Sequence, residues 1–373
     1  MRYPSLGRFA VLLALVSPSV LVAQTSWQQV GFDVGQTYNN PYETVLNTSD
    51  VKNLKVLWDV ELNAAGEANS VPVPGLTMNA GIIVAGDNGA DPSLSGLDET
   101  SGGYVWQTHD GNGAAAIAEG VAFSSNEGHE LSAINATNGA TLWTVELKGT
   151  YLPSPLPSMA ADGVVLVSDG SGAFWAIDQA TGKLLWSHNI EEGTKYPAAA
   201  ANGRVFVCAA GCYAFDQSGD LLWSRTGNAN SVLASGGMVF VSTSSGTFAL
   251  DAATGNTMWH YGLGGSSVAA ALANGILYTS GHSITALNAK TGSVIWTAPV
   301  KTLFPLAVAN GVLYAHAGGG TLFAIDAQTG ATLVRVGTDS PSTGPIVVNG
   351  RVFVGTSNEY FGGADIWAIG LTP

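Results

Sequence analysis

The chain has few charged side chains and is especially short of positive ones. Only 11% of its 373 residues are charged, with 13 lysines and arginines against 27 acidic residues. An acidic surface repels phosphate backbones and anionic lipid headgroups, so we expect no binding of nucleic acid or membrane surfaces. The longest apolar run, "FAVLLALV", is too short for a membrane span.

Cysteine is equally scarce, with two residues in "VFVCAAGCYAF". Their separation places Cys208 and Cys212 on either side of a hairpin tip, and a disulfide between them is the favoured prediction. The alternative, a redox pair, lacks the C-x-x-C spacing of such sites. No C-x-x-C-H haem motif is present, and no cysteine near the N-terminus offers a lipid anchor.

Residues 1–23 have the features of a secretory signal peptide. Arg2 and Arg8 precede the apolar run, and a cut after Ala23 fits the small residue there. Removing this segment leaves 11 basic and 27 acidic residues, a net charge of −16. We expect residues 24–373 to form one exported domain, monomeric and periplasmic or extracellular.

Glycine is abundant, at 48 residues, and much of it belongs to a repeat. Seven copies of one pattern end 36 to 43 residues apart. They are "LDETSGGYVW", "INATNGATLW", "IDQATGKLLW", "FDQSGDLLW", "LDAATGNTMW", "LNAKTGSVIW" and "IDAQTGATLV". Such a period is typical of stacked or radially arranged units.

A second motif precedes most copies, as in "ADGVVLV" and "ANGRVFV". Its Asn-Gly or Asp-Gly dipeptide favours a type I′ hairpin turn. Each unit is therefore predicted to contain four strands. The conserved-looking acids accept turn hydrogen bonds, and the glycines take left-handed positions. These structural positions include Asp178, Gly182, Asp251, Gly255, Asp326 and Gly330.

The repeat tryptophans are predicted to pack between neighbouring sheets. They are Trp106, Trp143, Trp186, Trp223, Trp259 and Trp296, with Trp58 as a seventh near the N-terminus. "LKVLWDVEL", which contains Trp58, supplies the final strand that the C-terminal "DIWAIGL" unit lacks. The sequence thus predicts an all-β, eight-bladed β-propeller of four-stranded antiparallel blades, closed by an N-terminal strand joining the C-terminal blade. Residues 24–53 form a lead-in segment.

The pattern "x-A-I-D-x-x-T-G-x-x-x-W" resembles the repeat of the pyrroloquinoline-quinone-like (quinoprotein-like) propeller superfamily. The resemblance covers nearly the whole mature chain and includes the lead-in. It implies a fold shared by quinone-dependent alcohol dehydrogenases and by a propeller lipoprotein of outer-membrane barrel assembly. The dehydrogenases have longer inserted loops, an adjacent Cys-Cys pair and a Ca²⁺ held by Glu, Asn and Asp. This chain has no Cys-Cys pair, so no catalytic or cofactor-binding residue is transferred to it.

Candidate sites are few. Asp87, Asn88 and Asp91 in "GDNGADPS" are weak candidates for a Ca²⁺ site without EF-hand spacing, and ordinary turn chemistry is favoured. The loop "TSNEYFGGAD" offers Asn358, Glu359, Tyr360 and Phe361 as partner-contact candidates.

The variable loops also carry histidines and cations. His129, His282 and His316 are assigned to loops of different blades, which disfavours a shared metal. Cations that could meet a quinone follow the final strands, and solvated loop charges are favoured: Lys148, Lys195, Arg225, Lys301 and Arg335.

These observations favour an exported propeller that acts as a binding or scaffold module through its loop-bearing rim and needs no cofactor. Enzymatic activity is undecided and disfavoured. The alternative is a compact quinoprotein oxidoreductase of alcohol or sugar dehydrogenase type, using PQQ and calcium.

Overall fold

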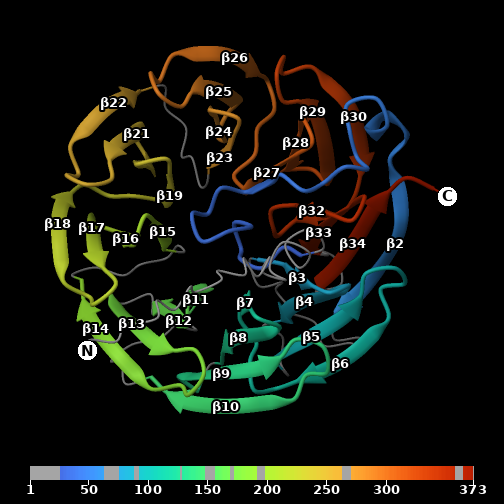
Figure 1. Ribbon diagram of the computed structural model, residues 1–373. Coiled ribbons are helices and arrows are strands. Elements are labelled where there is room, and N and C mark those ends of the chain that lie inside the picture. Colours follow the sequence, from blue (N-terminus) through green and yellow to red (C-terminus); the bar gives the residue numbers. More distant parts are fainter. Residues whose placement is uncertain are drawn as a thin grey trace, which may run out of the picture.

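Eight antiparallel sheets are arranged in a ring in the computed structural model (Figure 1). The structure describes residues 26–62, 75–87, 92–126, 128–147, 156–168, 172–190, 198–262, 270–357 and 364–372. The predicted eight-bladed propeller is confirmed, including closure of the ring by an N-terminal strand. The predicted signal segment lies outside the described residues.

Blades 1 to 7 each have four strands in chain order from the centre outward. Blade 1 contains β3 (Thr77–Asn79), β4 (Ile82–Asp87), β5 (Ser93–Asp98) and β6 (Tyr104–Thr108). Blade 2 contains β7 (Ala116–Ala118), β8 (Val121–Ser125), β9 (Glu130–Asn135) and β10 (Thr141–Glu146). Blade 3 contains β11 (Leu156–Ala161), β12 (Val164–Ser168), β13 (Ala173–Asp178) and β14 (Leu184–Asn189). Blade 4 contains β15 (Ala199–Ala201), β16 (Arg204–Cys208), β17 (Gly211–Asp216) and β18 (Leu221–Thr226).

The second half of the ring repeats this order. Blade 5 contains β19 (Ser231–Ser235), β20 (Met238–Thr243), β21 (Gly246–Asp251) and β22 (Thr257–Tyr261). Blade 6 contains β23 (Ala270–Ala273), β24 (Ile276–Thr279), β25 (Ile284–Asn288) and β26 (Val294–Ala298). Blade 7 contains β27 (Leu306–Ala309), β28 (Val312–Ala317), β29 (Thr321–Asp326) and β30 (Thr332–Gly337), with β1 (Asn39–Asn40) added in parallel to β27.

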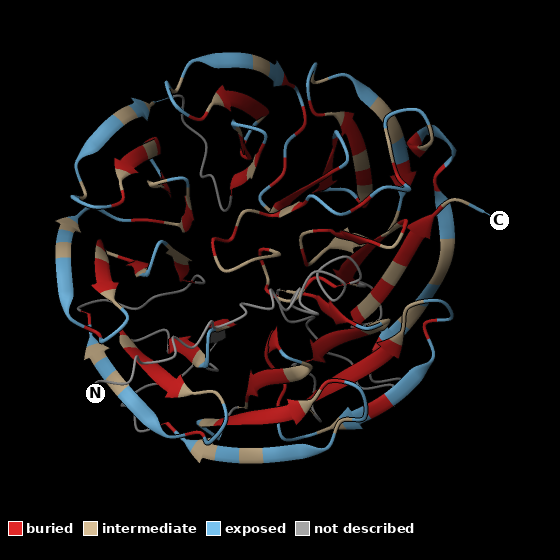
Figure 2. Ribbon diagram, in the orientation of Figure 1, coloured by how far each residue is buried: buried red, intermediate tan, exposed pale blue. Residues whose placement is uncertain are grey.

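Blade 8 is built from both ends of the chain. It contains β32 (Ile346–Val348), β33 (Arg351–Ser357), β34 (Ala364–Gly370) and the outer strand β2 (Lys55–Leu62). The short β31 (Ser340–Pro341) also pairs with β33, and a 3-10 helix, η1 (Val51–Asn53), precedes β2. Burial is greatest in the inner three strands, whereas the outer strands alternate between exposed and half-buried residues (Figure 2).

The turn between the first two strands has the same form in every blade. Both central residues have positive φ, as in Asn202–Gly203 (52° and 71°) and Asn274–Gly275 (50° and 76°). This is the predicted type I′ geometry, whose twist matches that of the flanking strands. The structure adds Ala80–Gly81 and Glu119–Gly120 to the dipeptides expected from the sequence.

The repeat tryptophans join each blade to the next. Trp143 Nε1 donates to the carbonyl of Gln179, 3.1 Å away in the following blade, and its ring lies on Gly182. A Cβ on Gly182 would stand 2.8 Å from Trp143 Cε3, so glycine is required by packing as well as by its φ of 70°. Trp58 makes the same contact with Glu99 and Gly102, linking blade 8 to blade 1.

A β-bulge interrupts every outer strand just before the tryptophan position. In blade 3, Trp186 pairs with Ala176 and Leu184 pairs with Ile177, which leaves Leu185 as the extra residue. The same shift occurs in all eight sheets. Bulges disrupt the regular ladder of an edge strand, so these outer edges are poor templates for pairing with another sheet.

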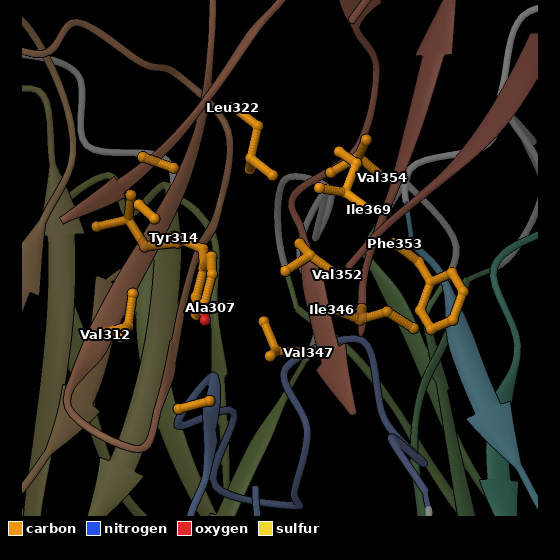
Figure 3. Close-up of a cluster of buried hydrophobic side chains, with 14 of the residues drawn as sticks. Ala307, Val312, Tyr314, Leu322, Ile346, Val347, Val352, Phe353, Val354 and Ile369 are labelled. Atoms are coloured by element: carbon orange, nitrogen blue, oxygen red, sulfur yellow. The ribbon is translucent and has the colours of Figure 1, made fainter. Parts of the chain in front are cut away.

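The junction between blades 7 and 8 lacks a tryptophan, because Val334 occupies that position. The lead-in covers this junction instead. Leu46 and Val51 are fully buried there, and the Glu43 carboxylate accepts a hydrogen bond from Gly350 N at 2.9 Å. Figure 3 shows the apolar side chains of the two blades packed together, with Tyr314 on blade 7 and Val352 on blade 8.

Candidate functional site

The two faces of the ring differ in regularity. Strands 1 and 3 of a blade run in the same direction, so the type I′ turns and the Asp-containing turns share one face, here called the turn face. The loops between strands 2 and 3, and the connections between blades, share the opposite face, here called the loop face. The turn face repeats from blade to blade, whereas the loop face varies in length and composition.

The lead-in segment crosses the centre of the turn face and bonds to every blade (Figure 1). In each case the partner lies two residues before the type I′ dipeptide, so the contacts form one layer around the axis. Five carbonyls of the segment accept hydrogen bonds from backbone N–H groups of the inner strands: Gln28 from Ile117, Val34 from Ala200, Gly35 from Ala234, Thr37 from Leu272 and Tyr38 from Val308. The backbones of Trp27 and Met78 bond to each other in both directions. The side chains of Gln29 and Asn40 bond to the backbones of Ala160 and Val347.

The Gln29 side chain makes three hydrogen bonds in this layer. Its buried amide donates to the carbonyls of Ile117 (3.1 Å) and Ala160 (2.9 Å) and accepts from Ala160 N (3.1 Å), so one side chain joins blades 2 and 3. Gly35 lies so close to blade 5 that a Cβ would stand 2.3 Å from Ala234 O. Asp33 holds the turn by accepting from Thr37 N and Oγ1 at 2.9 and 2.7 Å, although burial raises the pKa of its carboxyl.

This segment satisfies N–H groups on the inner strand edges that would otherwise face the channel. It also occupies the turn-face end of the channel with the chain's own residues. The inner strands are rich in small apolar residues such as Ala199, Ala271 and Ala307, with the uncharged polar residues of β3 and β19 among them, and they carry no acidic or basic side chain. The described channel wall therefore offers small apolar surface and few groups for acid–base chemistry.

Two of the predicted sites fall largely outside the described residues. Asn88 and Asp91 lie outside them, and Asp87 is buried at the end of β4 with 2% exposure. The four partner-contact candidates, residues 358–361, also lie outside them. Among the side chains that are described, no group of three or more His, Cys, Asp or Glu lies close enough to hold a metal ion.

His316 does not lie in a loop, as the sequence suggested, but on β28, where it is fully buried. Its Nε2 lies 2.8 Å from Thr338 Oγ1, and burial lowers the pKa of the imidazole to about 4. The loop assignment was wrong because the strand continues through His316, and the glycines of "YAHAGGG" begin only after the strand has ended at Ala317. His129 and His282 are exposed on blades 2 and 6.

The described cations do not gather at the channel. Arg225 and Arg335 lie on the outer strands of blades 4 and 7, where each guanidinium covers a phenylalanine ring, and Lys301 is exposed. Lys148 and Lys195 lie outside the described residues. A quinone with three carboxylates needs several cations that converge on one place, and the described residues do not provide that arrangement.

One acidic group lies on the loop face of blade 8. Burial, together with the charges of Glu61, Asp339 and Asp59, raises the pKa of Asp365 to about 6. Asp365 pairs with Glu61 across β34 and β2. This carboxyl therefore changes charge in mildly acidic solution.

Cys208 and Cys212 form a disulfide at the loop-face tip of blade 4, where they are directly paired across β16 and β17. The acids of the Asp-containing turns act as turn acceptors. Asp178 accepts from Thr181 N and Oγ1 (2.8 and 2.6 Å), and the Thr181 hydrogen bonds lower its pKa. Asp251 does the same with Thr254. These residues serve the fold.

The regular blades, the repeat tryptophans and the N-terminal closing strand define a quinoprotein-like propeller. The family model described as "Outer membrane protein assembly factor BamB" matches residues 90–195, 176–304 and 280–369, and the chain belongs to this family. Within the described residues, no helix is long and apolar enough to cross a membrane.

Both assembly factors and enzymes are among the relatives that this chain resembles. The Yersinia pestis outer membrane protein assembly factor BamB is 22% identical over 299 residues, covering 72% of this chain and 68% of that protein. Tetrathionate hydrolase from Acidithiobacillus ferrooxidans is 26% identical over 252 residues, covering 57% and 48%. The quinohemoprotein alcohol dehydrogenase of Comamonas testosteroni superposes with a TM-score of 0.76 at 12% identity, covering 93% of this chain and 80% of that one. This last likeness concerns the fold alone.

Proposed function

We propose that this protein is an exported, non-catalytic scaffold that binds a protein partner through its loop face. The observation that carries the proposal is the path of the lead-in segment. It bonds to all eight blades at the turn-face end of the channel, so that end is occupied by the chain itself. The loop face is left as the variable surface.

The family supports a binding role, because its model and several named relatives are assembly factors. The loops between strands 2 and 3 differ in length from blade to blade, so the loop face offers a surface that does not repeat. The proposal needs no cofactor. A signal peptide at residues 1–23 would deliver the protein to the envelope or the medium.

The rival function is a quinoprotein oxidoreductase, and one experiment separates the two. The purified protein is titrated with pyrroloquinoline quinone and Ca²⁺ while dye reduction is followed with alcohols and sugars. We expect neither saturable quinone binding nor turnover. Saturable binding with substrate-dependent dye reduction would contradict the proposal.

A further inference from the structure

A pocket of about 430 Å³ opens on the loop face between blades 4 and 5. Its lining includes the apolar side chains of Val241, Phe248 and Leu250, together with Cys212 of the disulfide. Hydroxyl and amide groups from Thr243, Ser245 and Asn228 form its polar wall. This size and this mixture of apolar and polar groups suit a small organic molecule or one side chain of a partner.

The loops between strands 2 and 3 are shortest in the two blades that form the pocket. The loops between strands 2 and 3 contain only two residues in blade 4, between Cys208 and Gly211, and in blade 5, between Thr243 and Gly246. In the other six blades the strand bounds leave three to six residues for this loop. The disulfide holds one of the two short loops.

Among the described residues that line the pocket, Arg225 alone is charged. Its guanidinium lies 5.4 Å from the centre of the Phe248 ring, and Nη1 donates to Thr257 Oγ1 at 2.5 Å. Nη1 also donates to the carbonyl of Gly255 at 3.5 Å, and within the described residues neither Nη2 nor Nε makes a hydrogen bond. Among the described residues that line the pocket none is acidic, although the protein as a whole has a net charge of −14.

Arg225 departs from the repeat. It stands two residues after the tryptophan position, where the other blades have Val60, Thr108, Val145, His188, Tyr261, Ala298 and Val336. The blade fold therefore does not need a cation there. A charge found at one of eight equivalent positions, beside an open pocket, indicates a role specific to this junction.

We propose that this pocket binds a carboxylate attached to an apolar group. A planar guanidinium pairs with a carboxylate through two parallel N–H···O hydrogen bonds. Val241, Leu250 and the disulfide of Cys212 supply apolar contact for the rest of the ligand. The strongly acidic protein disfavours multiply charged phosphates. The site does not depend on the proposed scaffold function.

Calorimetric titration of the purified protein with benzoate tests the site, with benzamide as the neutral isostere. We expect benzoate to bind and benzamide to bind at least tenfold more weakly. Arg225→Gln should weaken benzoate binding at least tenfold. Arg335→Gln is the matched control, because Arg335 also covers a phenylalanine ring, that of Phe323 in its own blade 7, at 5.1 Å. The benzoate affinity of Arg335→Gln should equal that of the unchanged protein.

Asn228→Asp provides a second variant in case Arg225→Gln does not fold. Asn228 is exposed on the pocket wall, so a negative charge there should weaken benzoate binding without affecting the core. Equal affinity for benzoate and benzamide, or a folded Arg225→Gln protein that binds benzoate normally, would overturn the proposal.

The peptide Ala-Ala-Phe, with a free or an amidated C-terminus, identifies the source of the carboxylate. Tighter binding of the free peptide than of benzoate supports a polypeptide C-terminus. Equal affinities of the free peptide and of benzoate support a free organic acid.

Discussion

Gly182→Ala tests whether the turn glycines are required by the tryptophan of the preceding blade. Gly182 has φ of 70°, and a Cβ there would stand 2.8 Å from Trp143 Cε3. Alanine in the left-handed region costs roughly 1–2 kcal/mol. Displacing the ring adds an overpacking cost of roughly 1–3 kcal/mol. We therefore expect a loss of about 2–5 kcal/mol in the free energy of unfolding, measured by urea denaturation with tryptophan fluorescence and circular dichroism.

Gly203→Ala is the control that isolates the packing contribution. Gly203 has φ of 71°, and nothing lies within 4 Å of its added Cβ. It should lose only the roughly 1–2 kcal/mol of backbone strain, partly offset by the reduced entropy of the unfolded chain. Equal losses in the two variants would refute the packing argument, because backbone strain alone would then explain both.

Three further variants probe separate features. Gln29→Ala should lower the free energy of unfolding by about 3 kcal/mol in urea denaturation, because three buried hydrogen bonds of about 1 kcal/mol each are lost; a change below 1 kcal/mol would contradict the bridging role. Cys208→Ser with Cys212→Ser should cost about 2 kcal/mol for so short a loop, and an unchanged thermal midpoint would count against the disulfide. Asp365 binds its proton more tightly in the folded chain than in the unfolded chain. Protonation of Asp365 therefore stabilises the fold fully below about pH 4, and this stabilisation is lost as the pH rises through about 6. Asp365→Asn should remove this pH dependence of the free energy of unfolding, which solvent screening limits to about 1 kcal/mol. Plots of the free energy of unfolding against pH that stay parallel for the two proteins from pH 4 to 7 would contradict the prediction.

The sequence predicted the blades well because each blade repeats the same local signals. The Asn202–Gly203 dipeptide, the turn acid Asp178 and the tryptophan spacing each specify a turn or a contact over a few residues. Their recurrence made the count of eight secure, and the unmatched Trp58 strand indicated how the ring closes.

The lead-in path could not be read in the same way. Its contacts pair residues far apart in sequence, such as Gln29 with Ala160, and its irregular turns have no period. The outer-strand bulges, such as the one at Leu185, were not predicted from the sequence, because a register shift depends on the pairing with the neighbouring strand. Arg225 was counted among dispersed cations, although comparison of equivalent repeat positions singles it out.

The central claim is that the turn face is structural and the loop face binds the partner. A photo-crosslinking residue placed singly at exposed loop-face positions, Asn228 and His282, is compared with the same residue at exposed turn-face positions, Asn202 and Asn274, in cells that produce the protein. The account predicts that the loop-face positions capture the same discrete protein, whereas the turn-face positions capture none. Capture of that protein from Asn202 and Asn274 instead would contradict it.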